Sequence, residues 1–113
     1  MRIDHVQVAA PPGCEAEARA FYGGVLGLRE VEKPESLRAR GGIWFEHLHV
    51  GVEADFRPAR KAHPAFVVGD LDALAERIGD VQWDAEIPGV RRFYAHDPFG
   101  NRLEFLSDER GNR

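Results

Sequence analysis

The two halves of this 113-residue chain repeat one order of predicted elements, and this repeat limits the possible folds more than any other feature. A strand, a helix and three strands are predicted first at 2–10, 14–26, 28–32, 43–46 and 47–53, and again at 63–68, 71–79, 81–85, 90–95 and 101–106. A polar, arginine-bearing loop is expected at 35–42. The repeat predicts one domain, residues 1–113, made of two βαβββ units at 1–56 and 61–108.

The strand patterns indicate how the units pack. One face of each predicted strand is apolar and has to be covered by the helices, so the opposite face is left open. We therefore expect an α+β fold with two open antiparallel sheets side by side, which together form one concave face. A helix cap is expected at Asp70, just before the second helix.

Composition excludes several classes of protein. With 43% hydrophobic and 30% charged residues, the chain is typical of a soluble globular domain. The net charge is −4 and there is no long basic run, which argues against a nucleic-acid partner. No apolar stretch approaches the ~18 residues of a membrane span. The chain begins with strand-like alternation instead of a signal peptide, and its single cysteine, Cys14, favours a cytoplasmic location.

Four metal-capable side chains occupy matching places in the two halves. His5 and His63 belong to the first strand of each unit, and His49 and Glu104 to the last. Alternation puts all four opposite the apolar faces, so we expect them to converge on the concave face. Imidazole and carboxylate together suit a divalent first-row metal, and a site with open positions would be catalytic. The alternative is four ordinary polar residues on a half-exposed sheet.

Other polar residues are given simpler interpretations. His47 and His96 have no counterpart in the other half, so we interpret them as surface residues. The arginines near the predicted concave face are interpreted as solvated charges, of which one or two could meet an anionic substrate at the mouth of the cavity. These arginines are Arg38, Arg40, Arg91 and Arg92.

Two motifs and the repeat together resemble a known family. The motifs are Phe21-Tyr22-x-x-Val25-Leu26-Gly27-Leu28 in the first helix and Asp97-Pro98-x-Gly100-Asn101-x-x-Glu104 at the last turn. With His5 in the first strand, they resemble the vicinal oxygen chelate superfamily over essentially the whole chain. That superfamily includes glyoxalase I, fosfomycin-resistance thiol transferases, extradiol dioxygenases, methylmalonyl-CoA epimerase and bleomycin-binding proteins.

The resemblance implies a ligand set and a type of chemistry. His5, His63 and Glu104 match metal-binding positions of the fosfomycin enzymes and extradiol dioxygenases. His49 falls where glyoxalase I has a metal-binding glutamate, which makes it the fourth candidate ligand. The implied cofactor is zinc, nickel, manganese or iron, which would chelate two neighbouring oxygens of a small molecule. The resemblance allows Glu104 or a metal-bound hydroxide as the catalytic base. The reaction would be that of a lyase, isomerase, dioxygenase or transferase.

Two other functions stay open. One is a metal-free small-molecule binding protein of the bleomycin-resistance type; those proteins lack the His/His/Glu set that this chain keeps. The other is a structural or regulatory module that retains the site by descent.

Open sheet edges and the resemblance predict a homodimer, in which His5 of one chain faces Glu104 of the other.

Overall fold

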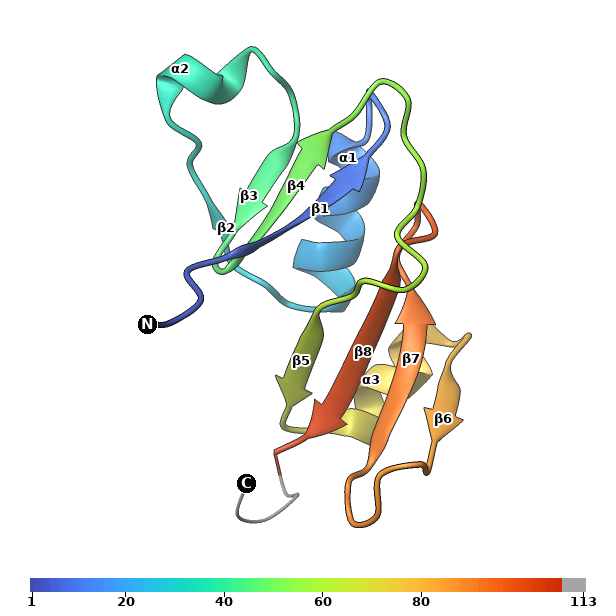
Figure 1. Cartoon of the computed structure of the whole chain (residues 1–113). Coiled ribbons are helices and arrows are strands. Elements are labelled where there is room, and N and C mark those ends of the chain that lie inside the picture. Colours follow the sequence, from blue (N-terminus) through green and yellow to red (C-terminus); the bar gives the residue numbers. More distant parts are fainter. Residues whose placement is uncertain (109–113) are drawn as a thin grey trace.

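The computed structural model describes residues 1–108 and consists of two βαβββ units, as the repeat predicts (Figure 1). The first unit contains β1 (Val6–Ala10), α1 (Glu15–Ala18), η1 (Arg19–Val25), β2 (Glu30–Val31), α2 (Glu35–Arg38), β3 (Ile43–Phe45) and β4 (Leu48–Val52). The second contains β5 (Ala65–Val68), α3 (Leu71–Ile78), β6 (Gln82–Asp84), β7 (Arg92–His96) and β8 (Arg102–Ser107).

Each unit forms one four-stranded sheet, with strand orders β1-β4-β3-β2 and β5-β8-β7-β6. The sheets are mixed, which corrects the expectation of purely antiparallel sheets: β1 pairs with β4, and β5 with β8, in parallel. The cause is the helical crossover, which returns the chain so that the first two strands of a unit run the same way. Two antiparallel reversals then leave the fourth strand parallel to the first.

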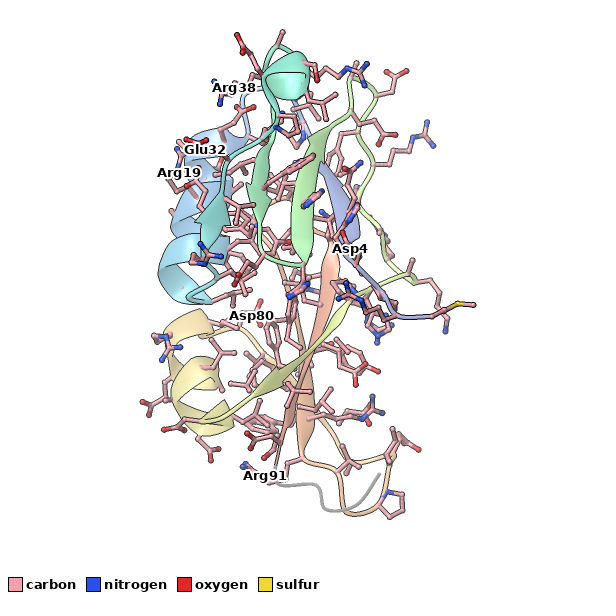
Figure 2. The ribbon with its side chains drawn as sticks, turned by 90° about the vertical axis from the view of Figure 1, so that its left-hand side faces the viewer. Asp4, Arg19, Glu32, Arg38, Asp80 and Arg91 are labelled. Atoms are coloured by element: carbon pink, nitrogen blue, oxygen red, sulfur yellow. The ribbon has the colours of Figure 1, made fainter. Side chains whose placement is uncertain are left out.

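The α1–η1 helix and α3 cover the same side of both sheets, and the other side is open (Figure 2). The buried core lies under the helices and includes Tyr22, Phe45, Phe93 and Phe105. The second predicted helix is confirmed together with its cap, because the Asp70 side chain accepts a hydrogen bond from the Ala73 N–H at 3.0 Å.

Two helical details were not predicted. The helix expected at 14–26 becomes a π-helix over Arg19–Val25. There the N–H of Leu26 donates to the carbonyl of Phe21, five residues earlier, at 2.9 Å. The loop expected at 35–42 contains the short helix α2. Among residues 1–108, no helix is long and apolar enough to cross a membrane.

A buried polar cluster joins the two units at the turn between β7 and β8. The hydroxyl of Tyr22 donates to Oδ2 of Asp97 at 2.6 Å, and the amide of Asn101 donates to the same oxygen and to the carbonyl of Ala9. The linker takes part as well, because the N–H of Ala59 donates to Oδ1 of Asn101 at 2.9 Å. The Asp97 turn therefore holds one unit against the other, which fixes how the two open faces lie.

Candidate functional site

The open face of the first sheet carries a stack of three rings. His49 pairs with Gln7 on β1 and with Trp44 on β3, so all three side chains share this face. The imidazole of His49 stacks on Trp44 at 3.9 Å and on His5 at 4.0 Å between ring centroids. Burial, together with the nearby charge of His5, lowers the pKa of His49. His49 is therefore neutral at neutral pH, the state in which imidazole binds metal.

His5 lies one residue before β1, so the strand predicted at 2–10 begins later than expected, at Val6. Nδ1 of His5 lies 2.9 Å from Oδ2 of Asp4, and the exposed fractions of the two side chains are 42% and 84%. Hydrogen bonding to His5 lowers the pKa of Asp4. Figure 2 shows Asp4 on the open side, near the level at which the two sheets meet.

The open face of the second sheet brings His63 against Glu104. Nε2 of His63 lies 2.9 Å from Oε1 of Glu104, and Nδ1 of His63 lies 2.8 Å from the carbonyl oxygen of Lys61. A carbonyl oxygen can only accept, so Nδ1 carries the proton and a neutral His63 has its lone pair on Nε2. A neutral His63 therefore turns a lone pair toward an ionised Glu104, and the two atoms need a proton or a cation between them.

The second oxygen of Glu104 is held by Arg92, which sequence analysis had interpreted as a solvated charge. The Arg92 side chain is only 8% exposed. It donates to Oε2 of Glu104 at 3.2 Å, to the hydroxyl of Tyr94 at 2.7 Å and to Oδ1 of Asp84 at 2.8 Å. Its Nε–H is buried without a hydrogen-bond partner among residues 1–108.

A sequence signal for Arg92 did exist. Arg92 and Tyr94 alternate with the buried Phe93 and Ala95, which places both on the open face. The pairing of Tyr94 with Glu104 then brings Arg92 near the carboxylate. Seeing this required the β7–β8 register as well as the alternation.

Of the four predicted ligands, His49 and Glu104 lie on β4 and β8, whereas His5 and His63 lie just before β1 and β5 instead of within them. The four form two pairs. His5 contacts His49 in the first unit, and His63 contacts Glu104 in the second. Within the described part of the chain, no three His, Cys, Asp or Glu side chains gather closely enough to hold a metal ion. Of the two histidines interpreted as surface residues, His96 is exposed, and His47 is an exposed residue with φ of +62° whose Nδ1 lies 3.0 Å from the carbonyl of Asp4.

The chemistry of the second pair fits a divalent cation. The Nδ1–H of His63 donates a hydrogen bond to a backbone carbonyl. Metal-binding histidines usually make such a hydrogen bond through the ring nitrogen that does not bind the metal. Glu104 is anchored through one oxygen by Arg92, leaving Oε1 on the side of Nε2. Imidazole nitrogen and carboxylate oxygen are both ligands of first-row divalent metals.

Solved structures with this fold include close and distant relatives. A glyoxalase family protein from Bacillus anthracis has 50% identity and a TM-score of 0.91, covering 96% of each chain. A lactoylglutathione lyase from Agrobacterium tumefaciens has 20% identity and a TM-score of 0.72, covering 99% of this chain and 97% of the other. A genomically encoded fosfomycin resistance protein from Listeria monocytogenes has 16% identity and a TM-score of 0.71, covering 95% and 93%.

The two distant structures share the fold, whereas the Bacillus anthracis protein is similar in sequence along nearly the whole chain. No protein-family model matches the chain, and no curated protein matches it. The repeated units, the open faces and the 50% identity together place this chain in the glyoxalase family of the vicinal oxygen chelate superfamily.

Proposed function

We propose that this protein is a metal-dependent enzyme that acts on a small molecule with two neighbouring oxygens. The observation that carries the proposal is the contact of His63 with Glu104, in which two metal-binding atoms face each other at 2.9 Å. A divalent ion bound there would supply Lewis-acid stabilisation of negative charge on the substrate oxygens. The names of the related structures, a glyoxalase family protein and a lactoylglutathione lyase, agree with such chemistry.

Each residue near the proposed metal site would have its own role. Lys61 fixes the tautomer of His63 through its carbonyl, so that Nε2 is the binding atom. Arg92 fixes Glu104 through Oε2, so that Oε1 is the oxygen left to bind or to accept a proton. His5 and His49 supply two further imidazoles, and the burial of His49 keeps its nitrogen lone pair available at neutral pH.

A homodimer would complete the site by bringing the His5–His49 face of one protomer to the His63–Glu104 face of its partner. The support is that each unit contributes half of a donor set. Exposed apolar side chains near the first strands of the two units, Ile3 at 78% and Val67 at 58%, also favour a partner surface. Cys14, a buried free thiol, fits a reducing compartment such as the cytoplasm.

The proposal predicts divalent metal binding by the chelator-stripped protein. Calorimetric titration with zinc, nickel, manganese and iron(II) should show at least one ion binding tightly. His63→Ala and Glu104→Gln should each weaken that binding at least about tenfold, because each removes a donor from the pair. Affinity should fall as the pH is lowered, since protons compete for imidazole nitrogen.

His96→Ala is the matched control, because His96 is an exposed histidine on the neighbouring strand β7. It should bind metal as the wild type does. If the wild type and His63→Ala bind all four ions equally weakly, the metal proposal is wrong. The metal-free binding protein of the bleomycin-resistance type would then be the better interpretation.

Dimerisation has its own test. Sedimentation at micromolar concentration should give twice the 12.7 kDa mass of one chain. Mixing His5→Ala protein with His63→Ala protein should restore part of the metal binding, since a hybrid dimer contains one intact site. A monomer in sedimentation, or no recovery on mixing, would contradict an intermolecular site.

A further inference from the structure

The connection between β2 and β3 breaks the repeat of the two units. It runs through residues 32–42 and contains α2, whereas the β6–β7 connection at 85–91 contains no helix. Figure 1 shows α2 standing away from the first sheet, at the end of a wide excursion of the chain. The excursion is therefore an addition to the first unit, and its role is separate from forming the shared fold.

The excursion is anchored at its base. The N–H of Gly42 donates to Oε2 of Glu15 at 2.6 Å, and the ammonium of Lys33 donates to the carbonyl of Gly41. Gly42 has φ of +86°, and a Cβ there would lie 2.3 Å from the carbonyl oxygen of Val50. Only glycine allows this close approach, so the loop is fitted to the sheet at this point.

A cavity of about 240 Å³ lies between the excursion and the open face. Its lining includes Gln7, Lys33, Leu37, Arg40, Trp44 and Gly51. Gln7 lies across Gly51, where a Cβ would be 2.7 Å from Nε2 of the amide. The missing side chain at Gly51 therefore makes room for the Gln7 amide within the cavity lining.

The charge of the lining is positive. Lys33 and Arg40 are its two charged residues, and no carboxylate lines the cavity. Glu15, the nearest carboxylate to Gly41, already accepts from Gly42. In the part of the chain that the structure describes, the Arg40 guanidinium has no hydrogen bond or ion pair, and the Gln7 amide has no hydrogen bond. Their donors are available to a ligand.

The cavity borders the candidate site through Trp44. Trp44 lines the cavity and stacks on His49 at 3.9 Å, and His49 in turn stacks on His5. The indole ring of Trp44 therefore lies between the cavity and the two histidines, and a planar ligand in the cavity would stack on this ring with its anionic end near Arg40. The arrangement suits a ligand with an anionic end and a planar body.

We propose that this cavity binds an oxyanion group, a carboxylate or a phosphonate, at one end of a planar substrate. Arg40 supplies the main charged donor, with Lys33 and Gln7 beside it. The assignment of this ligand as a substrate rests on the proposed function. Binding of the oxyanion itself does not, because the cavity is separate from the four candidate metal ligands.

The test uses chelator-stripped full-length protein with phenylphosphonate, benzoate and the neutral benzyl alcohol as probes. Tryptophan fluorescence in a Trp83→Phe background reports Trp44 alone, since the chain has 2 tryptophans. Both anions should bind more tightly than benzyl alcohol, and the tighter of the two identifies the preferred oxyanion. Their affinity should fall as salt is raised, because Arg40 is exposed.

Arg40→Ala should weaken anion binding roughly fivefold, and Arg40→Glu should weaken it further. Arg60→Ala removes the same charge from an exposed linker position and should leave binding unchanged. Arg40→Gln keeps a polar side chain and checks that any loss does not come from misfolding, with circular dichroism as the readout. The proposal is wrong if the anions bind no better than benzyl alcohol, or if Arg40→Ala and Arg60→Ala behave alike.

This experiment contains no metal, so its outcome is independent of the metal titration. Anion binding without metal binding would leave the cavity assigned and the enzyme proposal rejected. Metal binding without any effect of Arg40→Ala would reject the cavity and leave the enzyme proposal in place.

Discussion

Asp97→Ala should lower the free energy of unfolding by about 3–5 kcal/mol, a large part of the 5–15 kcal/mol typical of a domain. Asp97 is 5% exposed, and its carboxylate accepts from the hydroxyl of Tyr22, the N–H of Phe99, and both the N–H and the amide of Asn101. Removing the carboxylate leaves these donors buried without a partner, which is the most destabilising way to lose a hydrogen bond. Urea unfolding followed by circular dichroism measures the change.

Two variants separate this network from general effects of mutation. Tyr22→Phe removes one donor and leaves three on the carboxylate, so it should lower the free energy of unfolding by about 1–2 kcal/mol. Asp80→Ala changes an exposed aspartate and should have an effect below about 0.5 kcal/mol. A loss of less than about 1 kcal/mol for Asp97→Ala would mean that the cluster does not hold the two units together.

The Asp97 network also shows what the sequence could and could not predict. The residues of the turn identified a tight reversal before the last strand, because proline, glycine and asparagine favour such backbone angles. The partner of Asp97 was hidden, since Tyr22 lies 75 residues away within an apolar helical stripe. Burial with Asp97 nearby raises the pKa of the Tyr22 hydroxyl, which therefore stays a donor. Only the packing of the two units reveals this contact.

The sequence predicted the part of the candidate site that depends on which face of a strand each residue occupies. Period-two alternation placed His49 and Glu104 on the open faces, and the structure has them there. It did not give the distances between units, so it left open whether one chain alone would bring the four residues together. It also missed Arg92, because an arginine in isolation is most often solvated, and its burial depends on Asp84 and Glu104 across the sheet.

Arg92→Met should lower the free energy of unfolding by about 3 kcal/mol. The methionine fills similar space but leaves Asp84 and Glu104 without their cation, and both carboxylates are mostly shielded from solvent although they lie on the open face. Both carboxylates keep some solvent contact, with 26% and 13% of their side chains exposed. The loss of unfolding free energy should therefore be at the lower end of the range seen when one partner of a buried ion pair is removed. Thermal and urea unfolding measure it.

Arg91→Met is the matched control, because Arg91 is the adjacent arginine and its ion pair with Asp72 is exposed. Its effect should stay below about 1 kcal/mol. The double variant Arg92→Met/Glu104→Gln should recover part of the loss, since the neutral amide no longer needs a cation. Equal effects of Arg91→Met and Arg92→Met, or no recovery in the double variant, would contradict a buried charge network around Glu104.

The same variant connects stability with the proposed metal site. In Arg92→Met, Glu104 has lost its fixed cation, so a bound divalent ion would replace part of the missing positive charge. Added metal should therefore raise the melting temperature of Arg92→Met more than that of the wild type, and Glu104→Gln should abolish the difference. If metal stabilises the wild type and Arg92→Met equally, Arg92 and the metal do not act on the same carboxylate. Arg92 would then only hold the sheet together, and would not position Glu104 for binding.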